Sequence, residues 1–112
     1  MEKIDLEELG NFIGTERYHK GYCGVNWTDG VAYLATHGAG WLCTDICAYA
    51  PEHKEPFQLW ELKVKDGKGV LTMREDCDQP ELVRQEYDYT DFPEPGIKLY
   101  LVDGILLLPS EY

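Results

Sequence analysis

The stretch from Thr28 to Ala50 is the longest apolar segment in the first half of the sequence, and it limits what the chain can fold into. Its apolar residues recur at helical spacing on both sides of Gly38-Ala39-Gly40, where each glycine weakens a helix by roughly 1 kcal/mol relative to alanine. We therefore expect a helix that Thr28 caps through its hydroxyl, a break at the glycines, and a second helix that ends before Pro51.

The spacing of apolar residues changes after Pro51 from helical to alternating. Trp60, Leu62 and Val64 alternate with Glu61, Lys63 and Lys65, which is the pattern of a half-buried strand. Turn residues such as Asp66-Gly67 and Asp103-Gly104 separate further segments of this kind. The predicted strands span 57–65, 69–75, 82–90, 97–102 and 105–108, and a short helix is expected at 4–12.

These elements predict one α+β domain over residues 1–112. In the predicted fold, the N-terminal helices pack on one face of a four- to five-stranded antiparallel meander sheet. Residues 14–24 are expected to form a loop, because they contain three glycines and keep neither the helical nor the strand period.

The net charge is the compositional feature that most limits function. The chain has 10 lysines and arginines against 21 acidic residues, a formal net charge of -11. A field of this sign repels nucleic acid and anionic membranes, so we expect neither as a direct partner. The sequence also lacks a run of about 18 apolar residues and an export signal at its N-terminus, which predicts a cytoplasmic protein with reduced cysteines.

Two cysteine and histidine pairs are candidates for metal binding. Cys43 and Cys47 are four residues apart on a predicted helix, and His37 and His53 flank them. However, both cysteines fall on the apolar face that the core needs, and buried cysteine packs as a small hydrophobic residue. We therefore expect core packing, and we assign neither a metal ligand nor a cofactor. His19 and Cys23 repeat the spacing within a glycine-rich loop and are a weaker candidate.

A cysteine nucleophile is an alternative hypothesis. Cys23 with His19 or His37 as its base, near Asp29, would give a small enzyme or a ligand-binding domain beside the glycine-rich loop. No family-specific catalytic signature surrounds these cysteines, and Gly38 and Gly40 precede Trp41 rather than a phosphate-binding lysine or serine. We therefore assign no catalytic residue.

The acidic segment between Glu75 and Glu94 is the least ordinary feature of the sequence. A solvated surface that keeps the protein soluble is the simplest interpretation, and the spacing offers only part of a calcium loop. A negative surface could instead bind a basic groove, with Tyr87, Tyr89 and Tyr100 either as anchors or as core residues. Arg84 is the only basic residue among these acidic candidates: Glu75, Asp76, Asp78, Glu81, Glu86, Asp88, Asp91 and Glu94.

Five motifs occur in an order that resembles a known family. They are Thr28-Asp29-Gly30-Val31, Gly38-Ala39 with Trp41-Leu42, Phe57-Gln58-Leu59-Trp60, Tyr89-Thr90-Asp91-Phe92-Pro93, and the ending Leu106 to Tyr112. The chain is similar to an uncharacterised family of small bacterial proteins found on plasmids, phages and other mobile elements. The resemblance implies a shared fold but no established activity. Cys43, Cys47 and the insert Tyr18 to Gly24 depart from the pattern.

These observations lead to one hypothesis of function. We expect a small, acidic, non-enzymatic interaction protein of phage or mobile-element type. Its acidic residues would bind a protein partner with a basic surface, in the manner of a nucleic-acid mimic or an anti-CRISPR-like inhibitor of a host defence protein.

Overall fold

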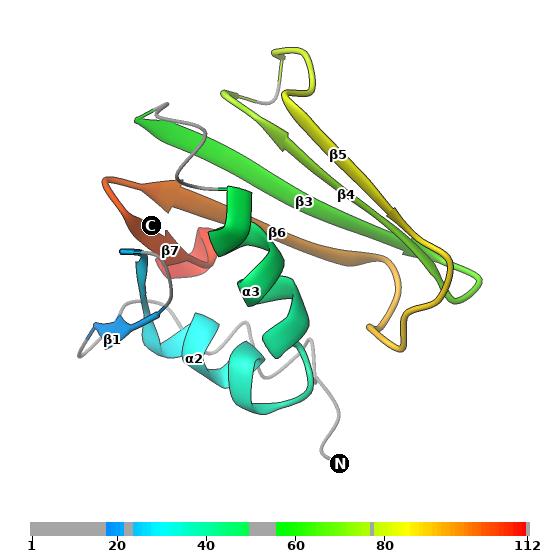
Figure 1. Ribbon diagram of the computed structural model, residues 1–112, viewed down its shortest axis with the longest axis horizontal. Coiled ribbons are helices and arrows are strands. Elements are labelled where there is room, and N and C mark those ends of the chain that lie inside the picture. Colours follow the sequence, from blue (N-terminus) through cyan, green and yellow to red (C-terminus); the bar gives the residue numbers. More distant parts are fainter. Residues whose placement is uncertain (1–17, 22–23, 50–55, 77, 112) are drawn as a thin grey trace.

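The computed structural model describes residues 18–21, 24–49, 56–76 and 78–111 (Figure 1). The helix that the sequence predicts at 4–12 lies outside these residues. The elements are β1 (His19–Lys20), β2 (Asn26–Trp27), α2 (Asp29–Thr36), α3 (Gly40–Tyr49), β3 (Phe57–Lys65), β4 (Lys68–Arg74), β5 (Val83–Tyr87), β6 (Gly96–Val102), β7 (Ile105–Leu107) and the 3₁₀ helix η2 (Pro109–Glu111).

The strands of the described residues form one seven-stranded sheet in the order β1-β2-β7-β6-β3-β4-β5. Strands β2 and β7 are parallel, and the other neighbouring pairs are antiparallel. The predicted four- to five-stranded antiparallel meander is therefore wrong. The sheet is mixed and has more strands than predicted. In a meander β6 would lie beside β5, whereas here it lies beside β3 (Figure 1).

The strand order has a physical reason in the side chains of β3. Leu59, Trp60, Leu62 and Val64 are all buried, so β3 is stable only with a partner strand on each side. By contrast, β5 carries the charged residues Arg84 and Glu86, which suit an edge strand because charge discourages pairing with another chain. The sequence did not predict β1 and β2, since two-residue strands are too short to show an alternating pattern.

The two faces of the sheet differ in what covers them. Trp60, Leu62 and Val64 form one buried cluster with α2 and α3 residues such as Leu34 and Ile46. We call this face the helix side, and we call the face with Glu61, Lys63 and Lys65 the open face. The predicted alternation in β3 is thus confirmed.

The two predicted helices and the break between them are confirmed. Gly38 has a φ of +100°, and the Ala39 N–H donates to the Leu34 carbonyl at 3.0 Å, which ends α2 before α3 begins at Gly40. The predicted cap by the Thr28 hydroxyl is wrong, because that hydroxyl donates to the Glu111 carboxylate at 2.6 Å. Neither helix of the described residues is long and apolar enough to cross a membrane.

Candidate functional site

The acidic residues between Glu75 and Glu94 all have exposed side chains and follow one edge of the sheet. Strand β5 forms this edge, since among the described strands it pairs with β4 alone. Four of the acids precede β5, Glu86 lies on it, and three follow it, so the set occupies both ends of the strand (Figure 1). We call this set the acidic edge: Glu75, Asp76, Asp78, Glu81, Glu86, Asp88, Asp91 and Glu94.

Glu81 differs from the rest of the acidic edge because two arginines pair with it. Its carboxylate lies 3.0 Å from Arg74 Nη2 and 3.3 Å from Arg84 Nη1. These ion pairs hold the segment before β5 against β4 and β5, and they offset the charge of Glu81. We therefore expect the other acidic residues to contribute more than Glu81 to any negative potential at this edge.

The lysines of the described chain lie on strands other than β5, whereas Arg74 and Arg84 meet the acidic edge at Glu81. Lys63 and Lys65 belong to the open face, and the strand register places the remaining basic side chains there too, since each lies opposite an open-face residue of the next strand. In the part of the chain that the structure describes, every lysine and arginine is therefore on the open face: Lys20, Lys63, Lys65, Lys68, Arg74, Arg84 and Lys98.

Helix α3 contacts the helix side of β5 through three residues spaced four apart. The Trp41 ring meets the Tyr87 ring edge-on, with centroids 5.0 Å apart. The Tyr87 hydroxyl donates to Asp45 Oδ2 at 2.6 Å, and the Tyr49 hydroxyl donates to Gln85 at 2.7 Å. Burial raises the pKa of Tyr87, and its hydrogen bond to Asp45 raises that pKa further, so the hydroxyl stays protonated.

Asp45 contacts β5, although it is not among the fully buried residues of α3. Asp45 is partly buried, and its carboxylate is satisfied there because it accepts a hydrogen bond from the Tyr87 hydroxyl. The spacing of Trp41, Asp45 and Tyr49 was a signal that could have revealed a shared face. That this face meets β5 could not be predicted from spacing alone.

The two helical cysteines lie in the core, as predicted. Cys43 and Cys47 are fully buried. Burial, with a smaller contribution from the neighbouring Cys47, raises the pKa of Cys43 from 9.0 to about 12, so this thiol is a poor nucleophile and a poor metal ligand at neutral pH. Within the described ranges, no three His, Cys, Asp or Glu side chains are grouped as a metal site. Cys23 and His53 lie outside those ranges.

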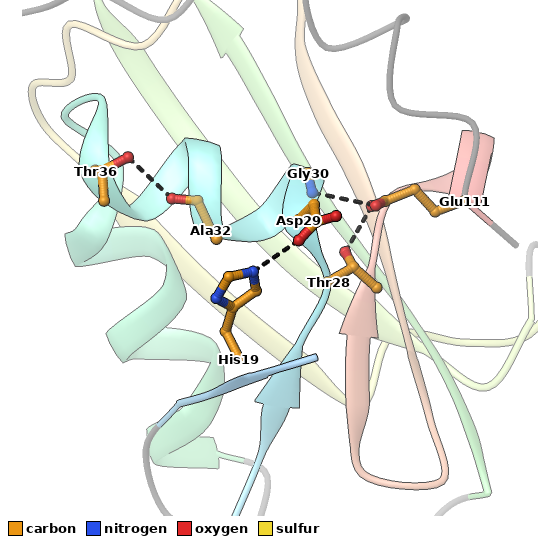
Figure 2. A network of polar contacts seen from close by, with 7 residues as sticks. All are labelled: His19, Thr28, Asp29, Gly30, Ala32, Thr36 and Glu111. Carbon is orange, nitrogen blue, oxygen red and sulfur yellow. Dashed lines mark hydrogen bonds and ion pairs between the residues drawn. The ribbon is translucent and has the colours of Figure 1, made fainter. Parts of the chain in front are cut away.

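The structure brings together two members of the alternative Cys/His/Asp set. His19 Nε2 lies 2.7 Å from Asp29 Oδ1, which joins β1 to the first residue of α2 (Figure 2). A hollow of about 270 Å³ is lined by the residues that precede this pair in sequence, Tyr18 and Thr28, and by others such as Asp103, but by neither His19 nor Asp29. His37 is at the opposite end of α2 and stacks on Tyr33 with ring centroids 3.9 Å apart, so it does not join this pair.

Glu111 fastens the start of α2 to the C-terminal part of the chain. Its carboxylate accepts hydrogen bonds from the Thr28 hydroxyl at 2.6 Å and from the Gly30 N–H at 3.1 Å (Figure 2). It also accepts one from the Leu108 N–H at 3.1 Å. A negative charge at this position also stabilises α2, because it lies beside the positive end of the helix dipole. Two of the motifs noted in the sequence, Thr28 to Val31 and Leu106 to Tyr112, therefore meet at this carboxylate.

Comparison with known proteins identifies the chain at the level of a family. No curated protein and no solved structure matches it. A family model described as "Family of unknown function (DUF6876)" matches residues 3–112. The predicted membership of an uncharacterised family is confirmed at this level, while an origin in phages or mobile elements stays a prediction. Since the match spans nearly the whole sequence, the chain belongs to the family of unknown function DUF6876.

Proposed function

We propose that this protein is a non-enzymatic binding protein whose acidic edge engages a protein with a basic surface. The observation that carries the proposal is the run of exposed carboxylates along β5 and at its two ends. The two arginines beside this run, Arg74 and Arg84, pair with Glu81, and the lysines of the described chain lie on strands other than β5. A partner approaching β5 from outside the sheet therefore meets a surface rich in carboxylates, which favours association with cationic groups.

The partner that fits this surface is a protein with a nucleic-acid-binding groove. Such grooves are basic because they neutralise phosphates, and a row of carboxylates along an edge strand can occupy one as a mimic of nucleic acid. An inhibitor of a host defence protein, encoded by a phage or another mobile element, would be a protein of this kind. This origin belongs to the proposal.

Neutralising two central acids of the edge is expected to weaken partner binding. The test variant is Glu86→Gln with Asp88→Asn, and the partner is first recovered by pull-down from a bacterial lysate. Calorimetry at 50 mM salt should then give about tenfold weaker binding, about 1.4 kcal/mol, because each exposed charge contributes up to about 1 kcal/mol. Binding of the unmodified protein should weaken as salt is raised, and a short DNA duplex should compete with it.

A matched control keeps the same change in net charge but spares the acidic edge. Glu61→Gln with Asp103→Asn removes one carboxylate from the open face and one from the turn between β6 and β7. This control should bind within about twofold of the unmodified protein. Equal weakening by both double variants would show that net charge, and not the acidic edge, governs binding, and the proposal would then fail.

The pairing of His19 with Asp29 favours a second candidate, a ligand-binding domain beside β1. A histidine and a carboxylate at 2.7 Å can hold and transfer a proton, and the residues before each of them, Tyr18 and Thr28, line a hollow. For this candidate, a small molecule found in a melting-temperature screen should no longer raise Tm after His19→Ala. His37→Ala, at the far end of α2, is the control. An unchanged shift in the His19 variant would rule the candidate out.

A further inference from the structure

A hollow lined by aromatic and acidic residues lies where α3 meets the end of β5. Its volume is about 370 Å³, and its walls come from α3, from the last residue of β5 and from the segment that follows. The acidic edge borders this hollow, since Asp91 belongs to the acidic edge and also lines the hollow. The lining consists of Trp41, Asp45, Tyr87, Tyr89, Thr90 and Asp91.

The inner wall of the hollow is fixed by contacts between α3 and β5. Tyr87 packs edge-on against Trp41, and its hydroxyl is held by Asp45 at 2.6 Å. These contacts restrain both rings and one carboxylate before any ligand arrives, which lowers the entropy that binding costs. Asp45 Oδ1 has no hydrogen-bond donor in the described part of the chain, so it remains open to a ligand.

The outer wall depends on a turn that points Tyr89 and Asp91 away from the core. The Thr90 N–H donates to the Gly67 carbonyl at 2.7 Å, and the Phe92 N–H donates to the Thr90 hydroxyl at 3.1 Å. Thr90 and Phe92 are consequently buried, while Tyr89 is 79% exposed. Packing does not explain such an exposed tyrosine, so its place at the rim of the hollow points to binding.

The chemistry of the lining selects a cation. Three aromatic rings offer negative faces to a positive group, and Asp45 and Asp91 supply carboxylates beside them. Among the described residues, no lysine or arginine lines the hollow, and the described basic side chains are on the open face of the sheet. Asp91 forms no ion pair with any described residue. An anion would be repelled here, whereas a planar guanidinium can stack on a ring and hydrogen-bond a carboxylate at once.

We propose that this hollow binds the guanidinium group of an arginine side chain presented by the basic partner. The inference rests on the proposed function, since it names the group on the partner that the acidic edge would guide into place. Arginine fits better than lysine because its guanidinium is planar and more weakly hydrated than an ammonium group.

The test uses N-acetyl-arginine amide as the probe and the indole N–H signals of the ¹⁵N-labelled full chain as the readout. The chain has three tryptophans. Trp41 lines the hollow, whereas Trp27 and Trp60 are buried in the core and serve as internal controls. The Trp41 signal, assigned by its loss in Trp41→Phe, should shift in a saturable way while the other two stay in place. A shift at Trp27 or Trp60 without one at Trp41 would overturn the proposal.

Two related probes test whether the guanidinium is what binds. N-acetyl-citrulline amide has nearly the same shape without the charge, and it should give no saturable shift. N-acetyl-lysine amide keeps the charge without the planar group, and it should bind at least about threefold more weakly. Binding of either compound as tightly as the arginine compound would overturn the assignment to guanidinium.

Substitutions at the outer wall separate binding from folding. Tyr89→Ala and Asp91→Asn should each weaken binding of the arginine probe at least about fivefold. Both side chains are exposed, so these variants should keep the dispersed spectrum of the folded chain. Tyr18→Ala, at an exposed tyrosine outside this hollow, is the matched control and should leave the affinity unchanged. Unchanged affinity in Tyr89→Ala would overturn the proposal.

The inference and the proposed function can fail separately. If neutralising Glu86 and Asp88 abolishes partner binding while Tyr89→Ala has no effect on it, the acidic edge binds and the arginine site is wrong. If the arginine probe shifts Trp41 but neutralising the acidic edge leaves partner binding intact, the hollow binds guanidinium and the proposed function is wrong.

Discussion

Replacing Glu111 with alanine is expected to lower the free energy of unfolding by about 3 kcal/mol. The carboxylate accepts hydrogen bonds from the Thr28 hydroxyl and from the Gly30 and Leu108 N–H groups. Thr28 and Gly30 are buried, so their donors would lose an acceptor without gaining full access to water. The loss should appear in urea denaturation as a lower midpoint with little change in slope.

Two control variants show whether the carboxylate itself is responsible. Glu111→Gln keeps one acceptor oxygen but loses the charge, so about half of the loss is expected. Ser110→Ala changes an exposed neighbour in η2 and should stay within about 0.5 kcal/mol of the unmodified protein. If Glu111→Ala is as stable as Ser110→Ala, the contacts of the carboxylate do not stabilise the fold.

The role of Glu111 shows a limit of reasoning from sequence. The motifs around Thr28 and Glu111 could be recognised one by one, but their contact joins residues 83 positions apart. Periodicity reports only which residues near each other in the chain share a face. It placed Thr28 correctly at the start of a helix, yet it could not show that a distant carboxylate would take over the capping role.

The strands show the same division between local and distant information. Alternation predicted the strand at Phe57–Lys65 and the faces of its side chains correctly, because both follow from the extended backbone. It could not order the sheet, since any strand with an apolar face can pair with several others. The alternating pattern also predicted a strand over 82–90, which is longer than the observed β5. The strand ends at Tyr87, and Tyr89 points into solvent because the Thr90 N–H bonds to Gly67.

The sequence predicted which residues give the candidate site its negative charge, but it did not predict the shape of the site. Counting acids located the acidic edge, and strand alternation anticipated that Lys63 and Lys65 face away from the helices. The aromatic hollow needed α3 and β5 to be placed against each other, which depends on Trp41 and Asp45 reaching Tyr87. From sequence both are ordinary helix positions, since nothing local to them indicates a contact with Tyr87, which is 42 positions from Asp45.

Replacing Gly96 with alanine is expected to cost about 4 kcal/mol or more, the largest effect among these substitutions. Gly96 has a φ of +113°, which L-amino acids rarely adopt, and a Cβ at this position would overlap the Leu62 carbonyl oxygen of β3. Both are backbone constraints that a side-chain movement cannot relieve. Because β6 is the central strand and β3 is its neighbour, forcing the two strands apart should weaken the whole sheet.

Gly104 provides a matched control just past the other end of β6. Its φ is +79°, but a Cβ there would meet nothing within 4 Å, so Gly104→Ala should cost only about 1 kcal/mol. Urea denaturation followed by circular dichroism compares the two variants. A Gly96→Ala chain that is unfolded without urea agrees with the expectation, whereas equal stability of both variants would contradict it. A large difference would show that the fold depends on the close approach of β6 to β3 at Gly96.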